Sequence, residues 1–444
     1  MDLVSAFIIF AASMAGVLYL GHDMLWAVII GFIGFFIVGL KRGFNFKYLL
    51  KLSLRGAKGS LIVAQFMLII GVLTGLWRIS GTFAILTFWG LKLINPKFFI
   101  LAAFALSCLI SYAIGTSFGT VSTIGAALLM LARSSGLQSQ TLELLTAGAV
   151  MSGIYFGDRA SPASSCANLV ASLTHTDLYK NIKLMMRTAF IPLLITIILY
   201  ALLSLNFPLS NLNNSGLAEL KFESLEANFN LTPWAITPAV LMLVLPLFNI
   251  KILKVFILSI TAAFICAVTF QGESFYNTLR CAVFGFQAND SAMELFNGGG
   301  LMSMVSVSLV LLVSGTYSAI LGDTNMLDNL QNNIIKLANK IGMFPVTLTA
   351  GVLADAAFCN QTIGVMITNQ LMAKPYELKN LQPQALAIDI SNSAVIAAGL
   401  IPWCLGCSVP LAVMNISPAC LIYAFYLYLL PLCCLLFTAN TLKK

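Results

Sequence analysis

The chain has 444 residues, of which 59% are hydrophobic and only 9% are charged, and its mean hydropathy is +0.94. Soluble domains carry roughly 25% charged residues, so this composition excludes a protein whose whole surface faces water. The formal net charge of +8 does not indicate a nucleic-acid partner, because many of the basic residues gather in one short stretch between apolar segments.

Long apolar runs recur along the chain, each close to the ~20 residues that a helix needs to span a bilayer. The clearest runs cover 61–76, 189–205, 240–270 and 421–439. The first run, 3–21, is not a convincing signal peptide, because Asp2 stands where such a peptide carries positive charge. We therefore predict an all-α polytopic protein of the cell membrane, with about eleven to thirteen hydrophobic segments in the lipid bilayer.

The orientation is predicted from the densest group of basic residues. These are Lys41, Arg42, Lys47, Lys51, Arg55 and Lys58, with no acidic residue among them. Loops rich in lysine and arginine stay in the cytoplasm. We therefore expect a cytoplasmic loop here, preceded by two helices and a cytoplasmic N-terminus. Lys443 and Lys444 indicate a cytoplasmic C-terminus as well.

One long polar stretch divides the chain into two halves. Residues 207–233 contain Glu219, Glu223 and Glu226 and read as a connecting loop, so residues 1–206 and 234–444 form the two transmembrane halves. The strings "FGTVSTIG" (118–125) and "FCNQTIG" (358–364) echo each other across this boundary. Secondary transporters are often built from two inverted repeats with broken helices near the bilayer midplane, and we predict that architecture, with broken helices or re-entrant hairpins.

The first half carries its polar motif at 157–168. Pro162 removes a backbone donor and disfavours helix at the residue before it, so a helix that enters at Glu143 should break here. Asp158 supplies a carboxylate where carboxylates are costly. Neutral oxygens follow from Ser161, Ser164 and Asn168.

We predict that these residues bind an ion or a solute, with Na⁺ held by Asp158, Ser161 and Asn168. Arg159 is expected to position Asp158 or an anionic substrate. The alternative is an ion pair between Asp158 and Arg159 at the end of the helix, with the serines serving helix packing.

The second half offers two polar motifs, at 355–364 and 389–403. The candidate site residues in them are Asp355, Asn360, Gln361, Thr362, Ser391, Asn392 and Ser393, with Asp389 as a further carboxylate. We predict that they complete one shared site with the first half. Interhelical hydrogen bonding remains the alternative for each of them.

Other motifs point to neither an enzyme nor a cofactor. Cys404 and Cys407 have C-x-x-C spacing but no second pair to complete a zinc site. The string "GTSFG" (115–119) fits G-x-S-x-G, yet that motif needs a strand–turn–helix context and a histidine, and the chain has only His22 and His175. A passive channel is disfavoured, because channels place ring-like filters around a conducting axis.

Four strings resemble the NhaC-type Na⁺/H⁺ antiporter family. They cover 71–96, 111–129, 152–169 and 399–407, and the resemblance runs from about Ala12 to Pro418. It implies an inverted-repeat fold of the ion-transporter superfamily with re-entrant hairpins. Members of the family include sodium/proton antiporters, a malate/lactate antiporter and proposed amino-acid carriers. The positions that fall on the family pattern G-D-K-x-S-P-x-S-D-T-T-N are Gly157, Asp158, Ser161, Pro162 and Asn168.

Departures from the family pattern leave two functions open. Ser165, Cys166 and Ala167 stand where the pattern has an aspartate and two threonines, and residues 391–395 lack its E-D-S-G-T. The resemblance implies an ion-coupled secondary transporter that moves Na⁺, H⁺ or both by alternating access. The alternative is a Na⁺- or H⁺-coupled carrier of an amino acid or small carboxylate. We expect small ions as coupling partners and no other cofactor, and a homodimer remains open.

Overall fold

The structure is a computed structural model that describes residues 3–20, 22–134, 140–208, 226–248, 250, 252–288, 296–324 and 337–437. Every regular element in these ranges is a helix, and one isolated bridge joins Phe286 to Gly298. The prediction of an all-α fold is therefore confirmed.

The helices of the first half are α1 (Leu3–Leu20), α2 (Leu25–Lys41), α3 (Phe46–Ile79), α4 (Thr82–Leu93), α5 (Phe99–Ile114), α6 (Ser117–Thr120), α7 (Ala126–Ser134), α8 (Gln140–Ala160), α9 (Ser165–Leu173) and α10 (Leu178–Asn206). The second half contains α12 (Thr237–Val244), α13 (Ile252–Thr269), α14 (Phe275–Phe284), α15 (Val305–Asp323), α17 (Met343–Phe358), α18 (Gln361–Leu378), α19 (Pro383–Asn392), α20 (Ala394–Ala397), α21 (Leu405–Met414) and α22 (Phe425–Phe437). Short 3₁₀ turns and one π-helical turn, Val121–Gly125, join some of them.

The number of apolar helices agrees with the sequence. Within the described residues, four helices, Phe46–Ile79, Pro96–Ile114, Leu178–Asn206 and Leu301–Gly322, are long and apolar enough to cross a membrane, and eight shorter apolar helices accompany them. The twelve together fall within the expected eleven to thirteen. Most of the predicted polar connection, 209–225, lies outside the described residues.

Two segments differ from their predicted form. The apolar run 240–270 is not one element: α12 and α13 are separate, and the 3₁₀ turn Leu245–Phe248 between them contains Pro246, which has no backbone donor for a helix. The basic stretch is mostly helix rather than loop.

Asn45 caps α3 by accepting a hydrogen bond from the Lys47 backbone N–H at 3.0 Å. The leucine-, lysine- and arginine-rich residues that follow favour helix, so most of the predicted loop forms the first turns of α3.

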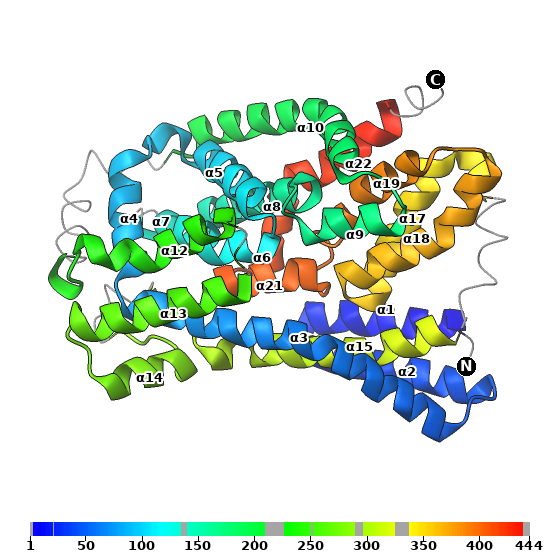
Figure 1. Cartoon of the computed structure of the whole chain (residues 1–444), viewed down its shortest axis with the longest axis horizontal. Helices are drawn as coiled ribbons and strands as arrows, with labels where there is room; N and C mark the ends of the chain where they lie inside the picture. The colour runs from blue at the N-terminus through cyan, green and yellow to red at the C-terminus, as the bar shows by residue number, and fades with distance from the viewer. Residues whose placement is uncertain are drawn as a thin grey trace.

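Figure 1 shows the layers that surround the centre of the molecule. The long helices α3 and α15 pack along each other on one side, and α10 runs along the opposite side beside α22. Between these layers lie α6, α8, α9 and α21 (Figure 1). The shortest and most interrupted helices thus occupy the interior.

Each half contains two interrupted helices. In the first half, Gly115 and Thr116 separate α5 from α6, and residues 161–164 separate α8 from α9. In the second half, Cys359 and Asn360 separate α17 from α18, and Ser393 separates α19 from α20. The predicted broken helices are therefore present in both halves, while the division into repeats stays a prediction.

The interrupted helices of each half approach closely. A Cβ atom on Gly115, whose φ is +78°, would lie 2.4 Å from the carbonyl carbon of Ala163 in the α8–α9 break. A Cβ atom on Gly351 of α17 would lie 2.9 Å from the Cα of Ala394, next to the α19–α20 break. Contacts this close admit only glycine, so glycine lets the breaks meet.

Candidate functional site

The break between α8 and α9, residues 161–164, is closed by its own serines. Ser164 caps α9 by accepting hydrogen bonds from the backbone N–H groups of Cys166 and Ala167, both at 3.1 Å. Its hydroxyl also donates to the carbonyl of Asp158. Ser161 donates to the carbonyl of Tyr112 in α5 at 2.6 Å. These hydroxyls satisfy the backbone groups that the interrupted helix leaves open.

Asp158 lies in the last turn of α8 with only 4% of its surface exposed. Its Oδ2 accepts a hydrogen bond from Nε2 of Gln361, the first residue of α18, at 3.0 Å. The same Nε2 donates to the carbonyl of Val395 at 3.0 Å. The backbone amide of Ser117, the first residue of α6, also interacts with the carboxylate. Four interrupted elements thus converge on one buried acidic group.

A cavity of about 260 Å³ adjoins this point and is lined by both halves. Its polar lining residues are Thr116, Ser165, Asn360, Gln361 and Thr362. Its apolar and small lining residues are Phe66, Met67, Ile70, Phe118, Gly119, Phe256, Leu405 and Gly406. This volume is enough for a small solute as well as for an ion with its water.

Arg159 does not position Asp158 by direct contact. Its buried guanidinium donates from Nε to Asn392 Oδ1 at 2.9 Å and from Nη1 to the Tyr426 hydroxyl at 3.0 Å. Its Nη2 donates to the Met185 carbonyl at 2.8 Å and to the Thr188 hydroxyl at 3.0 Å. The guanidinium therefore ties α8 to α10, α19 and α22, and the alternative ion pair with Asp158 is not formed.

Several predicted site residues are engaged away from the cavity. The Ser391 and Ser393 hydroxyls donate to carbonyls of α19, at 2.8 Å to Ala387 and at 2.6 Å to Asp389. Asp389 accepts a hydrogen bond from the Tyr376 hydroxyl. The Asn168 amide of α9 donates to the carbonyl of Ser164, the last residue of the α8–α9 break, at 2.7 Å.

Of the predicted residues, the structure brings Asp158 and Gln361 together and places Asn360 and Thr362 beside them. Asn360 caps α18, accepting from the Thr362 backbone N–H at 2.9 Å. Asp355 is buried one turn before the α17–α18 break. The sequence did not single out Thr116, although it follows Gly115 and lies just before the echoed string 118–125.

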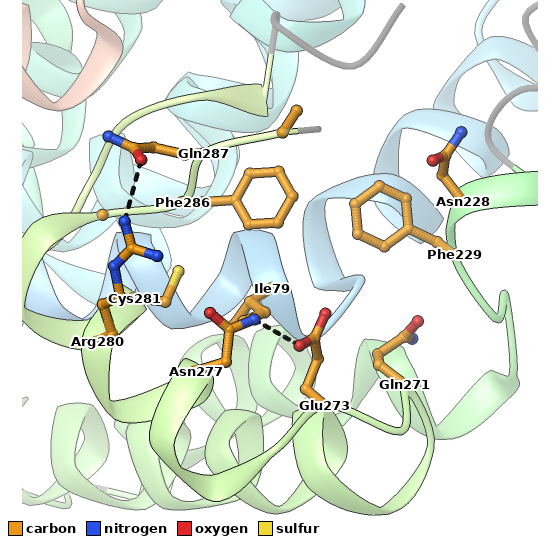
Figure 2. Close-up of a pocket in the computed structure, with 12 residues that line it drawn as sticks. Ile79, Asn228, Phe229, Gln271, Glu273, Asn277, Arg280, Cys281, Phe286 and Gln287 are labelled. Atoms are coloured by element: carbon orange, nitrogen blue, oxygen red, sulfur yellow. Dashed lines mark hydrogen bonds between the residues drawn. The ribbon is translucent and has the colours of Figure 1, made fainter. Parts of the chain in front are cut away.

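A larger cavity lies at the far end of α3. It measures about 450 Å³ and is lined by Ile79, Gln271, Glu273, Asn277, Arg280 and neighbouring residues. Figure 2 shows Asn277 donating to Glu273 and Arg280 donating to Gln287, at 2.6 Å and 3.4 Å. None of the predicted site residues and none of the helix breaks line it, so we place the candidate site at the smaller, central cavity.

The described residues contain no group of three or more histidine, cysteine or acidic side chains that could hold a metal ion. All ten cysteines are buried, and none of them forms a disulfide. Ser117 of the G-x-S-x-G string begins α6 and is buried. The central cavity itself is lined by amide, hydroxyl and apolar groups, and the Asp158 carboxylate is hydrogen-bonded to one of its lining residues, Gln361.

Comparison with known proteins relates the chain to a family. Residues 153–439 match the model of the Na⁺/H⁺ antiporter family. The chain is 27% identical to the malate-2H⁺/Na⁺-lactate antiporter of Bacillus subtilis (strain 168), over 84% of this chain and 80% of that protein. It is 25% identical to the Na⁺/H⁺ antiporter NhaC of the same organism, over 88% and 86%. It is 24% identical to the arginine/ornithine antiporter ArcD of Halobacterium salinarum, over 76% and 70%.

Proposed function

Since the chain belongs to the Na⁺/H⁺ antiporter family and is an ion-coupled transporter of the membrane, we propose that it exchanges Na⁺ for H⁺ by alternating access, with Asp158 at the cation site. The observation that carries the proposal is the hydrogen bond from Gln361 to Asp158, which joins residues 203 positions apart. A carboxylate of one half is thus held by an amide of the other. A relative motion of the two halves would change the site directly.

The chemistry of the central groups suits this role. Hard cations prefer oxygen ligands, and the central cavity offers hydroxyl and amide oxygens from Thr116, Ser165 and Asn360. The carboxylate of Asp158 is hydrogen-bonded to Gln361, which also lines this cavity. Isolated buried charges are costly, so a cation entering the cavity gains from the carboxylate. No cofactor beyond the coupling ions and no catalytic activity is part of this proposal.

The test uses purified protein in liposomes that contain a pH-sensitive dye. An inward Na⁺ gradient should change the internal pH in the wild type, and Asp158→Asn should abolish the change. Glu377→Gln, which neutralises an exposed carboxylate on α18, is the matched control and should behave like the wild type. Full Na⁺-driven pH change in Asp158→Asn would refute the assignment.

A second candidate function is the coupled transport of an organic solute. The observation that favours it is the central cavity of about 260 Å³, whose aromatic lining residues Phe66, Phe118 and Phe256 suit a carbon skeleton better than a bare ion. Two of the relatives are named for malate and lactate and for arginine and ornithine. The same liposomes, challenged with each of these solutes in place of the Na⁺ gradient, distinguish the two functions.

For the orientation, we propose that both termini lie in the cytoplasm. The basic residues at the start of α3 support this assignment through the positive-inside rule. The start of α1, the end of α22 and the start of α3 all lie toward the right-hand side of the molecule in Figure 1.

A further inference from the structure

Asp355 is the least compensated charged group in the described part of the chain. It is 0% exposed, and neither Oδ1 nor Oδ2 has a hydrogen-bond partner. More than 90% of buried polar groups in proteins are hydrogen-bonded, and an unpaired buried carboxylate is far more costly than a neutral one. A group left in this state needs a functional or chemical explanation.

The space around Asp355 is created by a glycine. A Cβ atom on Gly364 of α18 would lie 1.9 Å from Asp355 Oδ1. No side chain can therefore occupy that position without displacing the carboxyl group. The helix interruption at Cys359 folds α18 back onto α17 and brings Gly364 against Asp355.

The ionisable side chains of the neighbouring elements that lie close enough to interact electrostatically with Asp355 are weak partners for a metal cation. They are Tyr155 of α8, Cys166 of α9, Cys359 at the α17–α18 break and Cys404 before α21. The Tyr155 hydroxyl is itself buried without a partner. No lysine, arginine or histidine of the described residues pairs with Asp355.

Asp355 is also separate from the proposed cation site. Neither carboxylate lines the central cavity, but Asp158 accepts a hydrogen bond from the lining residue Gln361 at 3.0 Å, whereas Asp355 has no hydrogen-bond partner. Both carboxylates nevertheless act electrostatically on the same side chains, Tyr155 and Cys166. A change of charge at either carboxylate therefore changes the electrostatic potential at the side chains beside the other one.

We propose that Asp355 binds the exchanged proton, at a site distinct from the cation site at Asp158. The proton converts the buried carboxylate into a neutral carboxylic acid, and its release restores the negative charge, so that no other reactant is needed. This inference rests on the proposed Na⁺/H⁺ exchange and names the group that carries one of its two ions.

Two transport modes of the purified protein in liposomes separate the sites. Exchange of radiolabelled Na⁺ for unlabelled Na⁺ at equal pH requires only the cation site, whereas uptake driven by a pH gradient requires both. Asp355→Asn should retain Na⁺–Na⁺ exchange and lose uptake driven by the pH gradient. Asp158→Asn should lose both modes.

Gly364→Ala provides a second variant, which keeps the carboxyl group of Asp355 but changes the space around it. It should shift the Asp355 side chain and impair pH-driven uptake more than Na⁺–Na⁺ exchange. Gly322→Ala in α15 is the matched control, because a Cβ atom there meets nothing within 4 Å, and it should behave like the wild type.

The inference is overturned if Asp355→Asn keeps pH-driven uptake, or if it loses both modes while eluting as a folded monodisperse protein. If the wild type moves no Na⁺, the proposed function fails but the proton site remains testable. The infrared carboxylic-acid band should then be absent from Asp355→Asn and present in Asp158→Asn. An unchanged band in Asp355→Asn would refute the proton site independently of transport.

Discussion

Gln361 is the residue whose side chain holds the proposed cation site in one geometry, because its single amide nitrogen bridges Asp158 and the Val395 carbonyl. A hydrogen bond to a charged group contributes about 1.5–3 kcal/mol. We therefore expect Gln361→Ala to weaken the apparent affinity for Na⁺ by about tenfold to a hundredfold. The measurement is the Na⁺ concentration dependence of the internal pH change in liposomes.

Gln370→Ala, on the exposed side of the same helix, should leave the apparent affinity unchanged. A tighter apparent affinity in Gln361→Ala would contradict the prediction. It would mean that the amide competes with the ion rather than orients the carboxylate.

Single residues also show where sequence reasoning succeeds and where it stops. Polar groups in apolar segments must find partners, which is why Asp158, Gln361 and Arg159 were recognisable from their setting. The partners themselves lie on remote segments: Asn392 is 233 residues from Arg159. A pattern within one segment shows that a side chain needs a partner, but not which partner it finds.

At the scale of helices, the contact between α5 and α8 sets the position of Asp158. Gly153 and Gly157 are spaced as in the small-residue pairs that let helices approach closely in membranes. A Cβ atom on Gly157 would lie 2.1 Å from the carbonyl carbon of Ser111. We expect Gly157→Ala to destabilise the protein by about 1–3 kcal/mol, since overpacking costs that much in well-packed interiors.

Thermal unfolding in detergent measures this effect. Gly59→Ala in α3, where a Cβ atom meets nothing within 4 Å, is the control and should unfold at the wild-type temperature. Equal melting temperatures for Gly157→Ala and Gly59→Ala would show that α5 and α8 can separate without cost.

The helix breaks differ in how visible they are in the sequence. The α8–α9 break contains Pro162, which lacks a backbone donor and disfavours helix at the residue before it, and the break was predicted from this residue. The break after Cys359 has no proline and depends on a left-handed residue with φ of 54°, which non-glycine residues rarely adopt. The Cys359 carbonyl accepts a hydrogen bond from the backbone N–H of Leu405 at 3.0 Å. This contact comes from a distant segment, so the sequence around Cys359 does not reveal it.

At the scale of the whole molecule, the two halves are joined through their breaks. Asp158 and Gln361 meet across the halves, and so do Arg159 and Asn392. Composition and segment length predicted the fold class, because the apolar interior and the thickness of the bilayer constrain them. The sequence predicted that the two halves share one site, but not which residues meet there, because that depends on glycine contacts between distant helices.

The length of α3 makes the orientation testable. Its 34 residues extend about 51 Å at 1.5 Å per residue, which exceeds the ~30 Å thickness of the hydrocarbon core. The basic start of α3 and its end at Ile79 must therefore lie on opposite sides of the membrane. Glu273 lines the same cavity as Ile79 (Figure 2), so the turn before α14 lies on the side opposite to the basic residues.

We predict that Lys51→Cys is shielded from a membrane-impermeant thiol reagent in intact cells, whereas Tyr276→Cys is labelled. Both positions are exposed on the protein, Tyr276 at 76%, and the native cysteines are buried, so background labelling should be low. Permeabilised cells should label both positions, which controls for reactivity. The reverse pattern in intact cells would place the basic end of α3 outside and overturn the cytoplasmic assignment, because the positive-inside rule would then fail for this chain.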